Sequence, residues 1–282
     1  MANNRECGLF IAVGSKGVGK TYTTLGELRE YIANDESVGR SARTVLLLDA
    51  NNEFQSVTAI AYNAMEKDEH KRTAPIRALA GKKGMYRIMP FRIDRRPMTT
   101  SEIKVACIDI CNHFRKGLLL LEDYNRYING AEAEELVNML VTLRHRAVDC
   151  FIHLQSASPI STRLWQNLNY LRFHKINDNI DRYKNRIPYE LMKICQIAVN
   201  NEYMNGNKRV YFYVAVMDEK VVMPIPIFEQ ACIDYVSQNR GMLKKMKDSL
   251  EFKQGKTVKN DTKSILAEFI STMKVKYLTP MS

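Results

Sequence analysis

A glycine-rich segment near the start of the chain sets the tightest limit on its fold. Gly14 to Thr21 reads GSKGVGKT and matches the pattern GxxxxGK[ST] in full. Phe10 to Val13 before it is apolar and predicts a short buried strand, and Tyr22 to Ala33 after it has helical spacing. A glycine-rich turn between a strand and a helix is typical of a phosphate-binding loop (P-loop). We therefore expect an α/β protein that binds a nucleotide.

The residue types in this loop have distinct roles in holding a phosphate. Glycines let the backbone N–H groups point at one anion, and the following helix adds its positive end. Lys20 would reach the β- and γ-phosphates, and the Thr21 hydroxyl would ligate Mg²⁺. Asn207-Lys208 lacks the aspartate of a guanine-binding motif, which favours ATP over GTP. The predicted nucleotide-binding residues are Gly14, Ser15, Lys16, Gly17, Val18, Gly19, Lys20, Thr21 and Tyr22.

Two acid-tipped apolar segments compete to supply the acids of the site. Thr44 to Asp49 follows the P-loop closely and is expected to be a neighbouring strand. Gly117 to Asp123 (GLLLLED) comes after a further helix, and we assign it as the Walker B strand. Glu122 is then expected on the Mg²⁺ side, partly through water, and Asp123 is expected to orient or deprotonate the attacking water. The usual order of these acids is Asp then Glu, so slow turnover or exchanged roles are alternatives.

Three further polar residues are candidates for the reaction. Gln155 ends the next apolar segment, Cys150 to Gln155, where its amide could contact both γ-phosphate and water. Arg144 and Arg146 precede that segment and could stabilise transition-state charge in a neighbouring subunit. Surface arginines at a helix end are an equally good interpretation of these two.

The rest of the chain alternates apolar strands with helices, which indicates a parallel sheet covered on both faces. We predict a domain at 1–238, a basic linker or arm at 239–262, and an amphipathic helix with tail at 263–282. That last helix could dock on its own domain or on a partner. Further predicted strands are Met85–Phe91, Leu171–Ile176 and a hairpin of Val210–Met217 with Lys220–Pro226. Further predicted helices are Ser101–Arg115, capped by Ser101 or Thr100, Ala131–Arg146 and Phe228–Gln238.

Charge points to a polyanionic partner. The 282 residues carry a net charge of +11, and +6 of it falls between Arg240 and Ser282. Nucleic acid is the first expectation and an anionic membrane surface the second, while a merely solvated tail is as good an interpretation of the C-terminal charge. The sequence has no apolar run of membrane-spanning length and no visible secretory signal. Six scattered cysteines without a CxxC pair favour buried, reduced thiols over a zinc site.

Four segments in order resemble the FtsK–HerA superfamily of ring-forming, DNA-pumping ATPases. They are the P-loop at 14–21, LLLDANNEF at 46–54, LLLLED at 118–123 and LRHRAVDCFIHLQS at 143–156. The resemblance implies a RecA-like (ASCE) core with a mostly parallel central sheet, helices on both faces and a C-terminal helical extension. It also implies ATP hydrolysis between the subunits of a homo-oligomeric ring, six of them expected, with double-stranded DNA in the pore.

Carried over to this chain, the resemblance implies that Lys20 and Thr21 bind the nucleotide. It implies that Glu122 and Asp123 serve Mg²⁺ and water, and that Gln155 senses the γ-phosphate. Arg144 or Arg146 becomes the arginine that acts in trans. Asp49 and Glu53 match positions near the site, without a role that we can derive from the sequence.

A compact core with a short basic extension is most similar to a viral genome-packaging ATPase. Zonula occludens toxin-like phage proteins and conjugative coupling ATPases are also similar, but they usually carry a membrane helix. The packaging interpretation implies a capsid or portal vertex protein as partner of the C-terminal region, and a location in the host cytoplasm or with the virion.

Two alternatives remain. One is a nucleotide-gated switch with weak hydrolysis that docks a partner through 263–277. The other is a mobile-element DNA-transfer or secretion ATPase. A small-molecule kinase is less favoured, because no motif in the sequence supports it.

Overall fold

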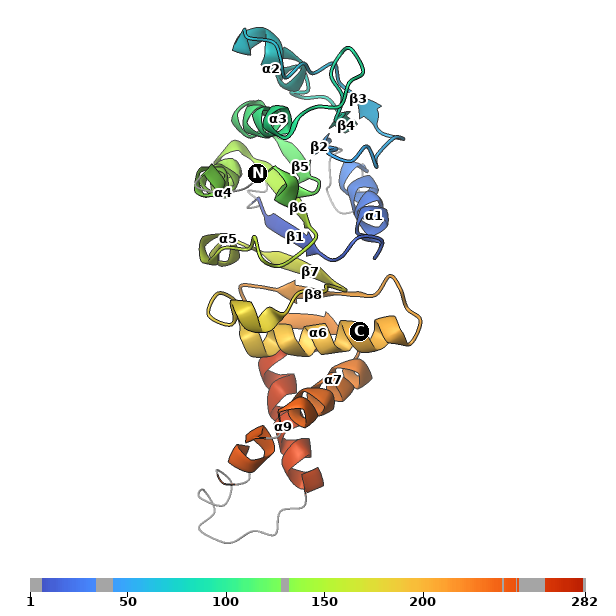
Figure 1. Ribbon diagram of the computed structural model, residues 1–282, viewed down its shortest axis with the longest axis vertical. Helices are drawn as coiled ribbons and strands as arrows, with labels where there is room; N and C mark the ends of the chain where they lie inside the picture. Colours follow the sequence, from blue (N-terminus) through green and yellow to red (C-terminus); the bar gives the residue numbers. More distant parts are fainter. Residues whose placement is uncertain are drawn as a thin grey trace, which may run out of the picture. The chain divides into compact units, whose positions relative to one another are not determined.

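A computed structural model describes residues 7–33, 43–127, 132–239, 241–246, 248 and 262–280. The chain forms two compact units, Met1–Asn169 (unit 1) and Tyr170–Ser282 (unit 2), which are taken in turn (Figure 1). The boundaries predicted at 238 and 262 stay predictions, and most of 239–262 lies outside the described residues, although 241–246 is helical.

Unit 1 is built on a parallel sheet. Its order is β1 (Leu9–Val13), β6 (Val148–Leu154), β5 (Gly117–Leu121), β2 (Thr44–Leu48), β4 (Gly84–Ile88) and the short β3 (Thr58–Ala59). Strands β2, β5 and β6 are buried along their whole length, which explains why they are apolar throughout. The parallel sheet predicted from these runs is confirmed. Because all neighbours are parallel, their carboxyl ends share one edge.

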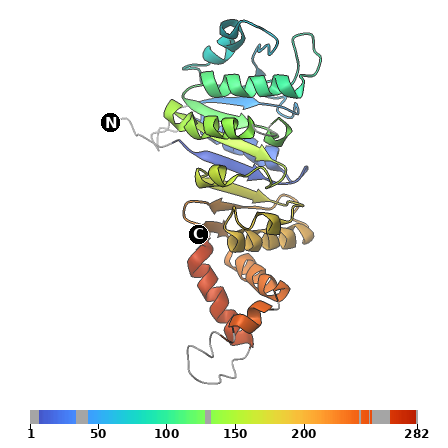
Figure 2. The same cartoon turned by 60° about the vertical axis from the view of Figure 1, so that its left-hand side comes forward.

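Helices cover both faces of this sheet. In Figure 1, α1 (Lys20–Ile32) lies on one side, and α3 (Thr100–His113), α4 (Glu132–Thr142) and α5 (Thr162–Gln166) lie on the other; Figure 2 shows the latter group from the front. On the α1 side, Leu28 packs with buried residues of β2 and β5, including Val45, Leu47 and Leu120. A further helix, α2 (Glu69–Arg77), packs on α3. The predicted arrangement of helices on both faces is confirmed.

Two predicted helix ends in unit 1 are wrong. Thr99, rather than Ser101 or Thr100, caps α3: its hydroxyl accepts the Glu102 N–H, and Glu102 accepts the Thr99 N–H in return, which forms a capping box. The helix predicted at 131–146 tightens into a 3₁₀ turn at η3 (Leu143–Arg146), since Ala147 follows with a left-handed φ of 57°.

Among its described residues, unit 2 combines antiparallel strands with three long helices. Strand β7 (Tyr170–His174) pairs antiparallel with β8 (Tyr211–Ala215), and β8 pairs with β9 (Lys220–Met223) as the predicted hairpin. Strand β10 (Leu278–Pro280) adds in parallel to β9. A short 3₁₀ turn, η4 (Ile180–Tyr183), precedes α6 (Tyr189–Met204). Sequence reasoning missed α6, because it is buried over most of its length and carries no clean amphipathic stripe.

The C-terminal helix belongs to unit 2. Four apolar residues on one side of α9 (Thr262–Tyr277) are buried, namely Ile265, Phe269, Met273 and Tyr277. The Phe269 ring stacks on Tyr235 of α7 (Ile225–Gln238) with centroids 6.5 Å apart. Lys274 pairs with Glu229 of α7 at 2.8 Å. The sequence left open whether this helix docks on its own domain or on a partner. In the structure it packs against its own unit. In the part of the chain that the structure describes, no helix is long and apolar enough to cross a membrane.

Candidate functional site

The P-loop joins β1 to α1 at the carboxyl edge of the unit 1 sheet. Gly14 N–H donates to the carbonyl of Leu154, which ties the loop to β6. Gly17 and Gly19 have φ of 83° and 89°, a left-handed conformation that side chains rarely adopt. Gly19 is the N-cap of α1 and no side chain caps this helix, so its first N–H groups are available to an anion. The backbone therefore has the form that the motif predicts.

Lys20 spans this loop. Its ammonium donates to the carbonyls of Gly14 at 2.5 Å and Ser15 at 3.0 Å. The charge thus already lies over the loop, where it could exchange carbonyl oxygens for phosphate oxygens. Of the other predicted loop residues, Val18 is buried, Lys16 is exposed, and Tyr22 on α1 is 67% exposed.

Thr21 meets an acid that sequence reasoning left without a role. The Thr21 hydroxyl donates to Glu53 at 2.7 Å. Glu53 is held there by Asp49, which is fully buried and accepts the backbone N–H groups of Glu53 and Phe54 at 2.8 and 3.1 Å. Asp49 in turn pairs with Arg87 of β4 at 2.6 Å. Asp49 is thus an anchor for the turn after β2, and Glu53 is the side chain that this turn presents to the P-loop.

Glu122 follows β5 and is nearly buried. Burial raises its pKa to about 8, and the nearby negative charges of Glu53, Asp49 and Asp123 add to the rise, while hydrogen bonds from Asn51 oppose it. The backbone N–H and the side-chain amide of Asn51 both donate to this carboxyl at 3.2 Å. A bound cation would lower this pKa and favour the charged carboxylate.

Asp123 lies on the other side of the site, next to Gln155. Its backbone is left-handed, with φ of 50°, and its carboxylate accepts the Gln155 amide at 2.7 Å and the Asn51 amide at 3.3 Å. Gln155 follows β6, the strand that lies between the P-loop strand and β5. Both acids, the glutamine and the P-loop therefore meet at one edge, as the sequence predicts.

Asn51 and Arg126 belong to the site and were missed. Arg126 donates to the carbonyl of Ala50 at 2.9 Å and to the Asn51 side-chain oxygen at 3.1 Å. These bonds fix which way the Asn51 amide points, toward Glu122 and Asp123. The available signal was the position of Asn51 at the end of an acid-tipped strand, which meets the end of β5 in a parallel sheet.

Arg144 and Arg146 lie away from these groups. They precede β6, whereas Gln155 follows it, and seven strand residues separate the two edges by about 20 Å. The Arg146 guanidinium donates to the Cys111 carbonyl at the end of α3, so it stabilises the unit internally. Arg144 is exposed.

The donors at this edge suit a magnesium–triphosphate ligand. Thr21, Glu53, Glu122 and Asp123 offer oxygen atoms, which hard cations prefer. Within the described ranges, no three His, Cys, Asp or Glu side chains are arranged to hold a metal ion by themselves. Mg²⁺ in such loops takes most of its ligands from phosphate and water, so one hydroxyl with acids nearby is a sufficient protein contribution.

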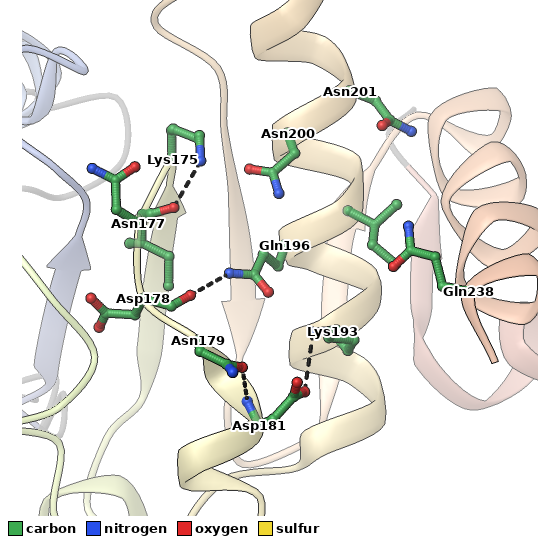
Figure 3. A pocket seen from close by; sticks show the side chains of 12 residues that line it. Lys175, Asn177, Asp178, Asn179, Asp181, Lys193, Gln196, Asn200, Asn201 and Gln238 are labelled. Carbon is green, nitrogen blue, oxygen red and sulfur yellow. Dashed lines mark hydrogen bonds and ion pairs between the residues drawn. The ribbon is translucent and has the colours of Figure 1, made fainter.

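A separate cavity of about 510 Å³ in unit 2 contains none of the predicted site residues (Figure 3). Its lining is polar, but several groups join elements of unit 2 to one another. Gln196 donates to the Asp178 carbonyl at 2.9 Å, and Lys193 pairs with Asp181 at 3.1 Å. The described residues that line this cavity do not form a set of loop N–H groups, lysine and acids like that at the P-loop.

No protein-family profile and no curated protein matches the sequence. Among solved structures, the chain is similar to the genome-packaging NTPase B204 of Sulfolobus turreted icosahedral virus 2 with AMP, at 11% identity over 78% of this chain and 96% of that one, with a TM-score of 0.49. It is similar to the N-terminal domain of zonular occludens toxin from Neisseria meningitidis, at 13% identity, 64% and 91% coverage and a TM-score of 0.35. It is also similar to the ATPase DotB of Legionella pneumophila, at 10% identity, 94% and 61% coverage and a TM-score of 0.33.

The packaging NTPase and the zonular occludens toxin domain are of kinds that the sequence analysis names. At such identities the likeness concerns the fold, and function is inferred below from the side chains. The strand order, with β6 between the P-loop strand and β5, and the helices on both faces make the fold α/β and RecA-like with a helical C-terminus, as predicted.

Proposed function

We propose that this chain is an ATPase that moves double-stranded DNA, as a subunit of a viral genome-packaging motor. The observation that carries the ATPase part is the meeting of the P-loop, Glu122, Asp123 and Gln155 at one sheet edge. The DNA part rests on the net charge of +11 and on the FtsK–HerA resemblance of four segments.

The side chains divide the work as follows. Lys20 would exchange its hydrogen bonds to the loop carbonyls for bonds to β- and γ-phosphate oxygens. The Thr21 hydroxyl oxygen would help to hold Mg²⁺ while its proton stays on the Glu53 side. Bound Mg²⁺ would neutralise charge on the phosphates. Glu122 would support the water shell of the metal, and Asp123 would orient the attacking water together with Gln155.

The remaining parts of the motor are supplied by other copies and partners. We propose a homo-oligomeric ring, six subunits expected, in which Arg144 reaches the neighbour's nucleotide, because the Arg146 guanidinium is already bonded within unit 1. A capsid or portal vertex protein would bind the C-terminal region. The proposed location is the host cytoplasm, or the virion during packaging.

Steady-state ATP hydrolysis with and without double-stranded DNA, across a salt series, tests the proposal. Wild type is expected to be stimulated by DNA, less so as salt rises, and Lys20→Ala is expected to lose activity at every salt concentration. Lys67→Ala, at an exposed lysine outside the loop, is the matched control and is expected to keep wild-type activity. Hydrolysis that DNA leaves unchanged in every assembly state would contradict the motor function.

A nucleotide-gated switch is the second candidate, and one observation favours it. Asp123 has a short side chain whose carboxylate is held by Gln155 and Asn51, which restrains its reach toward a water molecule. The apolar stripe of 263–277 is buried in unit 2, so a partner would have to dock elsewhere than on that stripe. Single-turnover assays separate the two, since fast hydrolysis with DNA present excludes a switch. A secretion or DNA-transfer ATPase would show the same ATPase but no preference for a capsid partner.

A further inference from the structure

A short basic loop protrudes at the end of β4. Residues 91–97 read FRIDRRP and contain three arginines and one aspartate. Phe91 and Pro97 pair across its base as an antiparallel bridge, and residues 93–97 are all exposed. Since β4 is parallel to β2 and β5, the loop leaves the sheet at the edge that carries the nucleotide site.

The loop is held in one shape by its own contacts. Arg92 N–H donates to the Arg96 carbonyl at 2.8 Å, and Arg95 N–H donates to the Arg92 carbonyl at 2.9 Å. The Arg92 guanidinium pairs with Glu102 of α3 at 2.9 Å, and the same glutamate closes the capping box of that helix. The tip is therefore restrained by bonds within the loop and by the ion pair to α3. This restraint reduces the conformational entropy lost when the loop binds a partner.

The arginine side chains at the tip make few contacts with the rest of the protein. Within the described residues, Arg95 makes no side-chain hydrogen bond or ion pair, and Arg96 has only Asp94 of the same loop, at 3.7 Å and largely exposed. Ile93 is 74% exposed, which is unusual for a large aliphatic residue on an ordered turn. The exposed guanidinium groups of Arg95 and Arg96 beside one protruding apolar side chain fit a nucleic-acid backbone, which offers phosphates and apolar sugar faces next to each other.

A chain of contacts links this loop's strand to the nucleotide site. Glu53 contacts Thr21 of the P-loop, Asp49 holds the Glu53 turn, and Asp49 pairs with Arg87 within β4. Arg87 also donates to the side-chain oxygen of Asn52 at 2.7 Å. A change in the contacts of Thr21 can thus reach Arg87 in β4, which lies four residues before the loop begins.

From these observations we propose that loop 91–97 is a contact surface for the phosphate backbone of double-stranded DNA, with Arg95 and Arg96 on phosphates and Ile93 against the sugar. This rests on the proposed function and adds which residues carry the DNA contact. The loop's place at the carboxyl edge makes it the element through which the nucleotide site would act on DNA.

Fluorescence-anisotropy titration of labelled duplex DNA over a salt series tests the loop with three variants of the full chain. Arg95→Gln/Arg96→Gln is expected to weaken binding and to lower the slope of log K against log salt by about 2, near 0.9 per lost phosphate contact. Ile93→Ser is expected to weaken binding with the slope unchanged. Lys82→Gln/Lys83→Gln removes the same charge at the opposite end of β4 and is expected to keep the wild-type slope.

ATP hydrolysis of each variant without DNA, together with its assembly state, completes the test. Both are expected to match wild type. Equal losses of slope in the arginine and lysine pairs, or wild-type binding by the arginine variant while wild type remains DNA-stimulated, would overturn the loop proposal alone. Loss of DNA-independent hydrolysis or of assembly would assign the arginines to a subunit interface instead. No DNA binding by wild type would overturn the proposed function and the loop with it.

Discussion

Glu122 is the residue whose chemistry depends most on its surroundings. A carboxyl with a pKa of about 8 carries its proton at neutral pH, whereas the proposed ATPase function would need its charge once Mg²⁺ is bound. Nucleotide binding is therefore expected to release a proton from this group. Glu122 itself would be neutral while the site is empty and charged when the site is loaded.

Glu122→Gln tests this protonation through stability. The raised pKa contributes stability that is complete below the ordinary value of about 4.3 and is lost as pH rises through about 8. Wild type should lose up to about 1.4 kcal/mol per pH unit within that window, and the glutamine variant should not. We expect the Tm of Glu122→Gln to exceed that of wild type at pH 8 and the gap to narrow toward pH 5. Glu268→Gln, an exposed carboxyl of α9, serves as the control, and a gap independent of pH would contradict the assignment.

Between elements, pairs of polar side chains fix where the site residues lie. The Asp49–Arg87 pair joins β2 to β4, and the Thr99–Glu102 capping box starts α3 directly after the basic loop. Both devices use residues that the strand and helix patterns alone leave unassigned. The Thr-x-x-Glu spacing was nonetheless visible in the sequence and identifies Thr99 as the cap.

Thr99→Ala is expected to lower the free energy of unfolding by about 1 kcal/mol, because the N–H of Glu102 loses its acceptor. Ser101→Ala, inside the first turn, should change it by less than about 0.5 kcal/mol. Urea denaturation of the two variants compares the observed cap with the one that the sequence first suggests. A larger loss for Ser101→Ala would contradict the observed cap.

The sequence predicts those parts of the site that are formed by residues close together in the chain. The P-loop and the acids at 122–123 are contiguous motifs on buried apolar strands, so both their identity and their shared edge could be predicted. Asn51, Glu53 and Arg87 act through the register of β2 against β5 and β4, which no local pattern encodes. The same reason hides α6, whose burial on most sides removes the periodicity that marks a surface helix.

At the scale of the whole molecule, the C-terminal elements α9 and β10 complete the packing and the sheet of unit 2. Phe269 stacks on Tyr235, and β10 adds the last strand beside β9. Phe269→Ala should cost about 3 kcal/mol in the free energy of unfolding, because it leaves a cavity between α7 and α9. Val275→Ala on the same helix, at a position 79% exposed, should be nearly neutral. Equal urea midpoints for the two variants would mean that α9 is not docked in solution.

The pairing of β1 with β6 has a consequence for how unit 1 comes to be folded. Gly8 and Asp149, bonded at the start of these strands, are 141 residues apart in the chain. Within unit 1 the P-loop strand is synthesised before the other strands, yet its sheet partner β6 is the last of the strands that the structure describes there. Closing so long a segment is slow, so this step is expected to govern the rate at which unit 1 folds. Nucleotide capture during refolding would then report the final joining step rather than the early collapse.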